Sequence, residues 1–154
     1  MIALVQRVIG ASVEVEASGH RAQIGIGLCV LLGVEPADDE ASSKWMASKL
    51  ARLRIFRDDA DKMNRSVVDI GGSVLLVSQF TLCGDCSQGN RPSFIGAAPP
   101  EQGRRLYEQV GAALKIEHAL PVEYGEFGAS MLVHIDNDGP VTLIVRSPGA
   151  GPVV

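Results

Sequence analysis

A short polar segment, Ser78-Gln79-Phe80-Thr81, follows directly on an apolar run at residues 73–77. The run is rich in valine and leucine and stands behind a pair of glycines, which predicts a buried strand leaving a turn. Two hydroxyls and an amide at the tip of a core strand need partners, because burying one of them unpaired costs about 1–3 kcal/mol. The segment is therefore either a strand end that satisfies its own backbone or a site where polar groups gather at the edge of a sheet.

The chemistry open to this segment is narrow. Its hydroxyls are weak nucleophiles, and no obvious general base stands beside Ser78 or Thr81. The histidines at 20, 118 and 134 form no recognisable motif with these hydroxyls, although a catalytic triad is a spatial arrangement. What the segment can supply is hydrogen-bond donors for a developing oxyanion. This favours cleavage of a bond that is already activated, such as an ester, over cleavage of an amide.

The cysteines do not predict a metal or redox centre. Cys83-Gly-Asp-Cys86 is a lone pair, whereas structural zinc usually needs a second pair of ligands at similar spacing. Cys29 lies in an apolar run, and the context of a redox motif is missing. We interpret Cys83 and Cys86 as incidental loop thiols and expect neither a metal nor a cofactor. A phosphate-binding loop, a dinucleotide fingerprint and a nucleophile elbow are also absent from the sequence.

Composition limits the class of protein. The chain has 154 residues, of which 46% are hydrophobic and 21% charged, which is typical of one globular domain. A net charge of −4 argues against a broad phosphate-tracking surface, yet it allows a protein that holds only the end of a nucleic acid. No apolar stretch is long enough to cross a membrane and the start does not resemble a signal peptide, so we expect a soluble cytoplasmic protein.

Strands are predicted on both sides of the polar segment. Residues 2–8, 11–17 and 23–34 have the alternation or apolar content of strands and indicate an antiparallel meander. Residues 130–136 and 141–145 indicate two more strands, separated by a turn at 137–140. Residues 66–70 fit either a strand or a turn, residues 57–64 read as a loop, and residues 84–96 read as a long loop of the kind that often carries function.

Two helices are predicted from capping residues and apolar stripes. The first begins at Asp38 or Asp39, which can cap it. The second begins at Pro99-Pro100, because proline is tolerated in a first turn. The stripe of the first helix is Met46, Leu50 and Leu53, and that of the second is Leu106, Val110 and either Ala113 or Leu114.

Several segments together resemble one known family. They are Ser78-Gln79-Phe80-Thr81-Leu82, Arg91-Pro92-Ser93-Phe94, Asn137-Asp138-Gly139-Pro140-Val141-Thr142, the opening Met-Ile-Ala-Leu-Val-Gln-Arg-Val and Phe127-Gly-Ala-Ser-Met131. In this order they are similar to the D-aminoacyl-tRNA deacylase family over residues 1–146. Any one of these motifs is weak alone, and five in register are strong.

The resemblance implies an α+β fold: a single domain at residues 1–146 with a largely antiparallel, barrel-like sheet and two α-helices. It implies a homodimer with active sites at the subunit interface. The enzyme would hydrolyse the ester that joins a D-amino acid, or glycine mischarged on tRNA-Ala, to the 3′-terminal adenosine of tRNA. Neither a membrane nor DNA is expected as a partner. Residues 147–154 lie beyond the match, and we expect them to form a disordered tail.

The resemblance also implies roles for particular residues. The RNA 2′-OH would assist catalysis, so the protein would need little acid–base chemistry. A cis Gly139–Pro140 bond, inserted into the active site of the other subunit, would form a backbone wall that rejects L-amino acids as part of proofreading. The catalytic motif falls on Ser78, Gln79, Phe80 and Thr81, the selectivity motif on Gly139 and Pro140, the adenosine pocket on Phe127 and Met131, and a supporting arginine on Arg7.

Three alternatives stay open from the sequence. The chain could be a small-molecule esterase that uses Thr81 as its nucleophile. It could be a nucleic-acid-binding module of the same fold without activity. It could be an editing relative directed at glycine or L-amino acids, although such a relative would usually alter the Gly-Pro or Ser-Gln-x-x-Thr motif, and both are intact here.

Overall fold

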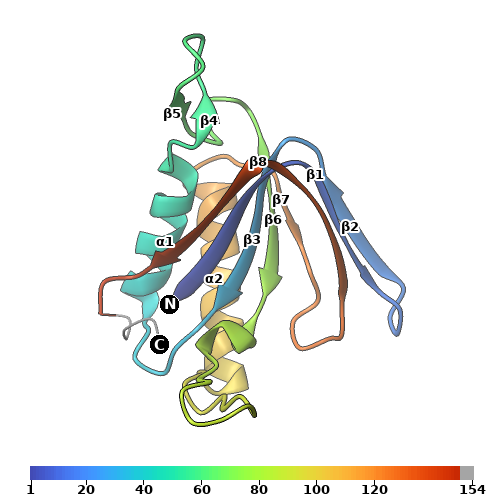
Figure 1. The fold of residues 1–154 in the computed structure, drawn as a ribbon, viewed down its shortest axis with the longest axis vertical. Coiled ribbons are helices and arrows are strands. Elements are labelled where there is room, and N and C mark those ends of the chain that lie inside the picture. The colour runs from blue at the N-terminus through green and yellow to red at the C-terminus, as the bar shows by residue number, and fades with distance from the viewer. Residues whose placement is uncertain (150–154) are drawn as a thin grey trace.

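The structure, a computed structural model, describes residues 1–149. A curved mixed sheet has two helices packed against one of its faces (Figure 1). Its strand order is β2-β1-β3-β6-β7, and β8 also pairs with β1. The predicted α+β fold class is therefore confirmed. None of the helices among residues 1–149 is long and apolar enough to cross a membrane.

Strand β1 (Ile2–Val15) is the centre of the sheet, because it pairs antiparallel with three other strands. They are β2 (His20–Ile24), β3 (Gly27–Gly33) and β8 (Leu132–Arg146). The prediction of two separate strands at 2–8 and 11–17 is wrong, since β1 runs through both. The predicted meander is also wrong, because β3 pairs with β1 and not with β2. The strand is long enough for β2 and β3 to share one edge of it in succession.

The other half of the sheet is parallel. Strand β6 (Ser73–Ser78) follows the predicted central strand closely, and all four residues between its ends are buried. It pairs parallel with β3 on one side and with β7 (Val122–Tyr124) on the other. The tip of β6 therefore lies at the same edge of the sheet as the end of β3, next to the 3₁₀ helix η1 (Phe80–Cys83).

Strand β8 replaces the turn predicted at residues 137–140. It continues from Leu132 to Arg146 and pairs with β1 on both sides of the Gly-Pro segment. The register passes from Val8↔Asn137 to Gln6↔Thr142, which leaves residues 138–141 as an irregularity beside Arg7. Asn-Asp-Gly-Pro has the composition of a hairpin turn. However, β1 is long enough to pair with both halves of β8 along the same edge.

Both helices begin where predicted. Helix α1 (Glu40–Arg52) is capped by Asp39, whose side chain accepts a 2.9 Å hydrogen bond from the Ser42 backbone. Helix α2 (Pro100–Ile116) carries proline in its first turn, and its stripe is buried at both Ala113 and Leu114. The main core lies between these helices and the sheet, and a second cluster lies on the other side of the sheet beneath β2.

The remaining segments are short. Strands β4 (Phe56–Arg57) and β5 (Met63–Arg65) pair as a separate two-stranded sheet, so the loop predicted at 57–64 is in part a hairpin. Residues 67–71 form turns, which settles the alternative left open there. The long loop at 84–96 is confirmed, with a single bridge between Asp85 and Ser93.

The tail predicted at 147–154 divides into two parts. Ser147 is buried and hydrogen-bonded, so the expectation of disorder is wrong at this residue. Its hydroxyl and backbone meet the first residue of the chain, which sequence patterns do not reveal. Residues 150–154 lie outside the described part of the chain.

Candidate active site

A cavity of about 500 Å³ opens beside the tip of β6. One wall consists of Ser78, Gln79 and Phe80, and the opposite wall includes Phe127 and Met131. The ends of β3 and the first turns of α2 close it. Five of the residues predicted for the site thus line one cavity, although they come from segments about fifty residues apart in the sequence.

The polar wall is built by the end of a parallel strand. Ser78 pairs with Leu32, and the Gln79 backbone N–H donates to the Leu32 carbonyl at 2.8 Å. The chain then turns into η1, where the Gln79 side-chain amide donates to the hydroxyl of Thr81. Thr81 is exposed beside the cavity and does not line it. The segment therefore presents an amide and hydroxyls at a solvent-accessible edge.

The apolar wall is fixed by α2. Gly103 lies so near Phe127 that an added Cβ would stand 3.4 Å from the ring. The Phe127 ring lies 5.8 Å from the ring of Tyr107 and carries the Arg104 guanidinium at 4.8 Å. The Tyr107 ring and the Arg104 cation hold Phe127 in the cavity wall.

Tyr107 lines the cavity and was missed by sequence reasoning. Its hydroxyl donates to the Leu76 carbonyl at 2.7 Å, and burial raises the pKa of this hydroxyl far above its usual value. The phenol therefore stays protonated and acts as a rigid strut between α2 and β6. The available signal was its helical spacing of four from Gly103, which places both on one face.

The predicted selectivity residues lie elsewhere in the chain. The Gly139–Pro140 peptide bond is cis, and both residues are exposed. Arg7 is buried, donates to the Ile55 carbonyl at 2.7 Å and forms an ion pair with Asp138 at 2.7 Å. Arg7 and Asp138 border a different hollow, at the start of β6 near Ser73.

Sheet register sets the separation between the Gly-Pro segment and the cavity beside Ser78. Arg7 pairs with Leu28, which pairs with Val74, whereas Ser78 pairs with Leu32. Four residues along a strand span about 13 Å, and crossing from β8 through β1 and β3 to β6 adds about 14 Å. The Gly-Pro segment of one chain therefore does not reach the Ser78 cavity of that same chain.

Metal ligands and bases are scarce around the cavity. Among residues 1–149, no group of three His, Cys, Asp or Glu side chains is placed to hold a metal ion, and no histidine lines the cavity. The Cys83 thiol donates to the Val34 carbonyl at 3.5 Å, and burial raises its pKa to about 11. Cys86 is exposed.

Known proteins match nearly the whole chain. A family model described as D-Tyr-tRNA(Tyr) deacylase matches residues 4–146. A D-aminoacyl-tRNA deacylase from Methylibium petroleiphilum is 58% identical over 144 residues, which are 93% of each chain. One from Deinococcus radiodurans is 56% identical over 143 residues, covering 93% of this chain and 97% of the relative.

Solved structures share the fold. One of a protein described as c-Myc DNA Unwinding Element Binding Protein has a TM-score of 0.87 and 42% identity, covering 97% of this chain and 100% of that one. One described as a probable eukaryotic D-amino acid tRNA deacylase has a TM-score of 0.78 at 15% identity, covering 94% and 97%. At that identity the second likeness shows the fold alone.

The matched family and relatives define the class of protein, which is that of the hydrolases acting on ester bonds. Within this class, the chain belongs to the D-aminoacyl-tRNA deacylase family.

Proposed function

We propose that this protein hydrolyses the ester between a D-amino acid and the 3′-terminal adenosine of tRNA, releasing both, and does the same for glycine mischarged on tRNA-Ala. The observation that carries this proposal is the cavity with Ser78, Gln79 and Phe80 on one wall and Phe127 and Met131 on the other. Its size suits a small ligand such as an aminoacyl-adenosine end. We place this proofreading in the cytoplasm, where charged tRNA is used.

Catalysis would depend on stabilising charge more than on moving protons. The cavity wall offers an amide and hydroxyls but no histidine or carboxylate. Such donors can stabilise an oxyanion on the ester carbonyl, which typically contributes about 10²–10³ in rate for each donor. The 2′-OH of the terminal ribose then assists the attack. An ester is activated enough for this modest machinery.

The apolar wall would bind the nucleoside. Phe127 and Tyr107 present ring faces and edges, and Met131 adds a polarisable thioether. An adenine base gains from stacking on such a surface, at about 1–3 kcal/mol per base. Only the end of the RNA would be held in the cavity, which suits a chain of net charge −4.

We further propose that the enzyme is a homodimer whose active sites lie at the subunit interface. Gly139 and Pro140 are exposed and stand too far from Ser78 within one chain, so a role at the cavity requires a second subunit. Strand β8 also presents apolar side chains to solvent, with Leu132 60% and Ile144 58% exposed. Exposed apolar side chains on the strand that carries an exposed backbone motif suit a subunit interface.

The Gly-Pro segment of the second subunit would filter chirality. Its backbone carbonyls can accept from the substrate ammonium while its bulk fills the place where an L side chain would lie. A D side chain points elsewhere, and glycine has none to clash. A wall of backbone atoms rejects the far commoner L-substrate without needing a particular side chain.

Matched D- and L-aminoacyl-tRNA test the function. We expect release of the D-amino acid from its ester and little or no release of the L-amino acid. Equal rates on both would contradict the proposed chirality filter. Binding of charged tRNA without loss of the ester would instead support a non-catalytic module. Equal turnover of an RNA-free D-amino-acid ester would support a small-molecule esterase.

A further inference from the structure

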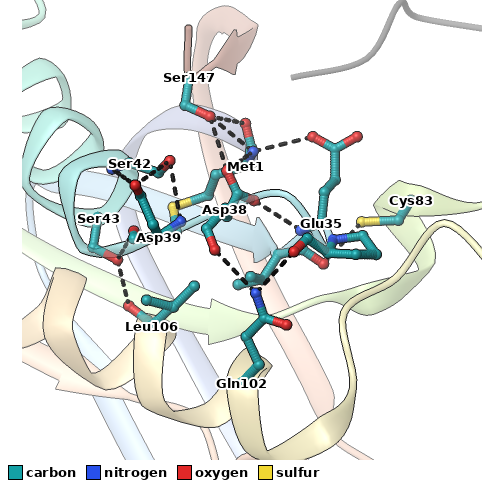
Figure 2. A network of polar contacts seen from close by, with 12 residues as sticks. Met1, Glu35, Asp38, Asp39, Ser42, Ser43, Cys83, Gln102, Leu106 and Ser147 are labelled. Carbon is teal, nitrogen blue, oxygen red and sulfur yellow. Dashed lines mark hydrogen bonds and ion pairs between the residues drawn. The ribbon is translucent and has the colours of Figure 1, made fainter. Parts of the chain in front are cut away.

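The α-amine of Met1 is buried in a polar network that joins distant parts of the chain (Figure 2). It donates to Asp38 Oδ1 at 2.6 Å, to Ser147 Oγ at 2.8 Å and to Glu35 Oε2 at 3.0 Å. Glu35 and Asp38 belong to the segment between β3 and α1, and Ser147 follows β8. The amine thus ties the start of β1 to the end of β8 and to the approach to α1.

The number of contacts fits an ammonium group. An ammonium has three N–H donors, and three acceptors surround it here. An acylated or extended N-terminus is an amide, which keeps one N–H and no charge. At least two of the three acceptors would then lose their donor, and the added atoms would enter a fully buried position.

The charges in the network also need the amine. The Asp38 side chain is 5% exposed and its other oxygen accepts from the Glu35 backbone at 2.8 Å, while Glu35 is 19% exposed. Two carboxylates therefore share this one cation in the network. Among residues 1–149, removing it leaves the buried carboxylate of Asp38 with backbone and hydroxyl partners only. A buried charge without its partner is strongly destabilising.

The network is joined to the cavity wall. The side chain of Gln102, in the first turn of α2, donates to the Asp38 carbonyl at 2.9 Å and to the Pro36 carbonyl at 3.1 Å. Gly103, the next residue, lines the cavity, as does Val34, which immediately precedes Glu35. Movement of the segment from Glu35 to Asp38 would therefore shift two sides of the cavity wall.

We propose that the free α-amine of Met1 is a structural cation of this fold, and that this amine is a modification-sensitive site. Formylation, acetylation or an N-terminal extension would remove the cation and weaken the attachment of both the approach to α1 and the end of β8. This inference does not depend on the proposed function, because its consequence is a loss of stability.

The test compares chains that differ only before Met1. One begins at Met1 and the other carries a Gly-Ser extension there, with any tag for purification kept at the C-terminus of both. We expect the extension to lower the midpoint of thermal unfolding by on the order of 10 °C, as breaking a buried ion pair does in a chain of this length. Equal midpoints would overturn the proposal.

Asp38→Asn separates lost charge from added bulk. In the chain that begins at Met1 it should lower the midpoint, because the amine loses a charged acceptor. In the extended chain it should lower the midpoint much less or raise it, because it removes an uncompensated charge. The control is Asp39→Asn, since Asp39 is exposed and caps α1 without touching the amine. Its effect should be the same in both chains.

Either of two further outcomes would contradict the proposal. Additive effects of Asp38→Asn and the extension would mean that bulk and not charge is responsible. An extended chain that fails to fold should be recovered as folded protein by Asp38→Asn, and no recovery would also count against the proposal.

Discussion

The guanidinium of Arg7 lies 2.7 Å from the carboxylate of Asp138, measured from Nε to Oδ2. Arg7 is buried and Asp138 is partly exposed, so the ion pair connects the interior of the sheet to its surface. Asp138 immediately precedes Gly139, and an added Cβ at Gly139 would stand 2.9 Å from Arg7 Nη2. The exposed Gly-Pro segment is therefore held from beneath by a buried cation.

Arg7→Lys should destabilise the protein by about 2–4 kcal/mol, because a single ammonium cannot satisfy both the Ile55 carbonyl and Asp138 in the guanidinium geometry. Urea unfolding measures the loss. Arg21→Lys is the control, since Arg21 is 76% exposed and pairs with Glu14 only at the surface. A change at Arg7 as small as that at Arg21 would show that the buried contacts contribute little.

Thr81→Ala should lower the single-turnover rate of deacylation by no more than roughly 100- to 1,000-fold, the range for the loss of one oxyanion donor. The threonine hydroxyl accepts from Gln79 and lies beside the cavity, which suits a supporting role. Ser87→Ala, a hydroxyl deletion in the exposed part of the following loop, is the matched control and should leave the rate unchanged. A collapse near 10⁶-fold with a trapped acyl-threonine would instead identify Thr81 as the nucleophile.

Mixed dimers should restore the D-selective deacylation that each of two variants lacks on its own. Ser78→Ala damages the cavity, and Pro140→Ala damages the proposed filter. If each active site uses the cavity of one subunit and the Gly-Pro segment of the other, a mixed dimer holds one intact site. Random mixing of equal amounts makes half of the dimers mixed, each with one intact site of two. The mixture should then recover roughly a quarter of the D-selective deacylation of the unmodified enzyme. No recovery after subunit exchange, verified by mass spectrometry, would place both groups in one chain's site or remove Pro140 from it.

Gly111→Ala should destabilise the protein by about 1–3 kcal/mol, because an added Cβ would stand 2.5 Å from Tyr124 Cε1. The Tyr124 ring cannot withdraw freely, since it packs against Tyr107 at 6.3 Å and beneath Lys115 at 4.5 Å. The control is Gly103→Ala on the same helix, where the nearest atom would be at an ordinary 3.4 Å. There, helix propensity should stabilise the fold by up to about 1 kcal/mol. Thermal unfolding of both variants checks the contrast.

A thiol reagent at about pH 8 should modify Cys86 first, because it is exposed and a thiolate is the reactive form. Burial raises the pKa of Cys29 to about 12 and that of Cys83 to about 11, so both stay protonated at this pH. For Cys29 the unfolded value is near 9.0, so unfolding releases a proton between about 9 and 12 and the stability falls as pH rises through this window. Labelling of Cys29 before unfolding would contradict its burial.

Local patterns predicted the elements well where each element carries its own signal. The apolar run ahead of Ser78 is β6, Asp39 caps α1, and the stripe from Leu106 to Leu114 faces the core. The cis geometry of Gly139–Pro140 agrees with the geometry expected from the resemblance, while the roles of these residues stay predictions.

Long-range features were beyond local patterns. Neither the parallel pairing of β6 with β3 nor the path of β8 along β1 is visible in one segment, because register depends on the partner strand. Tyr107 occupies a core stripe like any apolar residue, and only the fold shows that its hydroxyl reaches Leu76. The buried amine of Met1 carries no sequence signature at all.

The pairing of β1 with β8 bears on how the protein is made. Ile2 pairs with Arg146, so one edge of β1 stays open during synthesis until the whole of β8 has been made. Contacts of such wide sequence separation form slowly, and an open strand edge can pair with another chain in the meantime. We therefore expect the nascent chain to be most exposed to aggregation in the interval between the synthesis of β1 and that of β8.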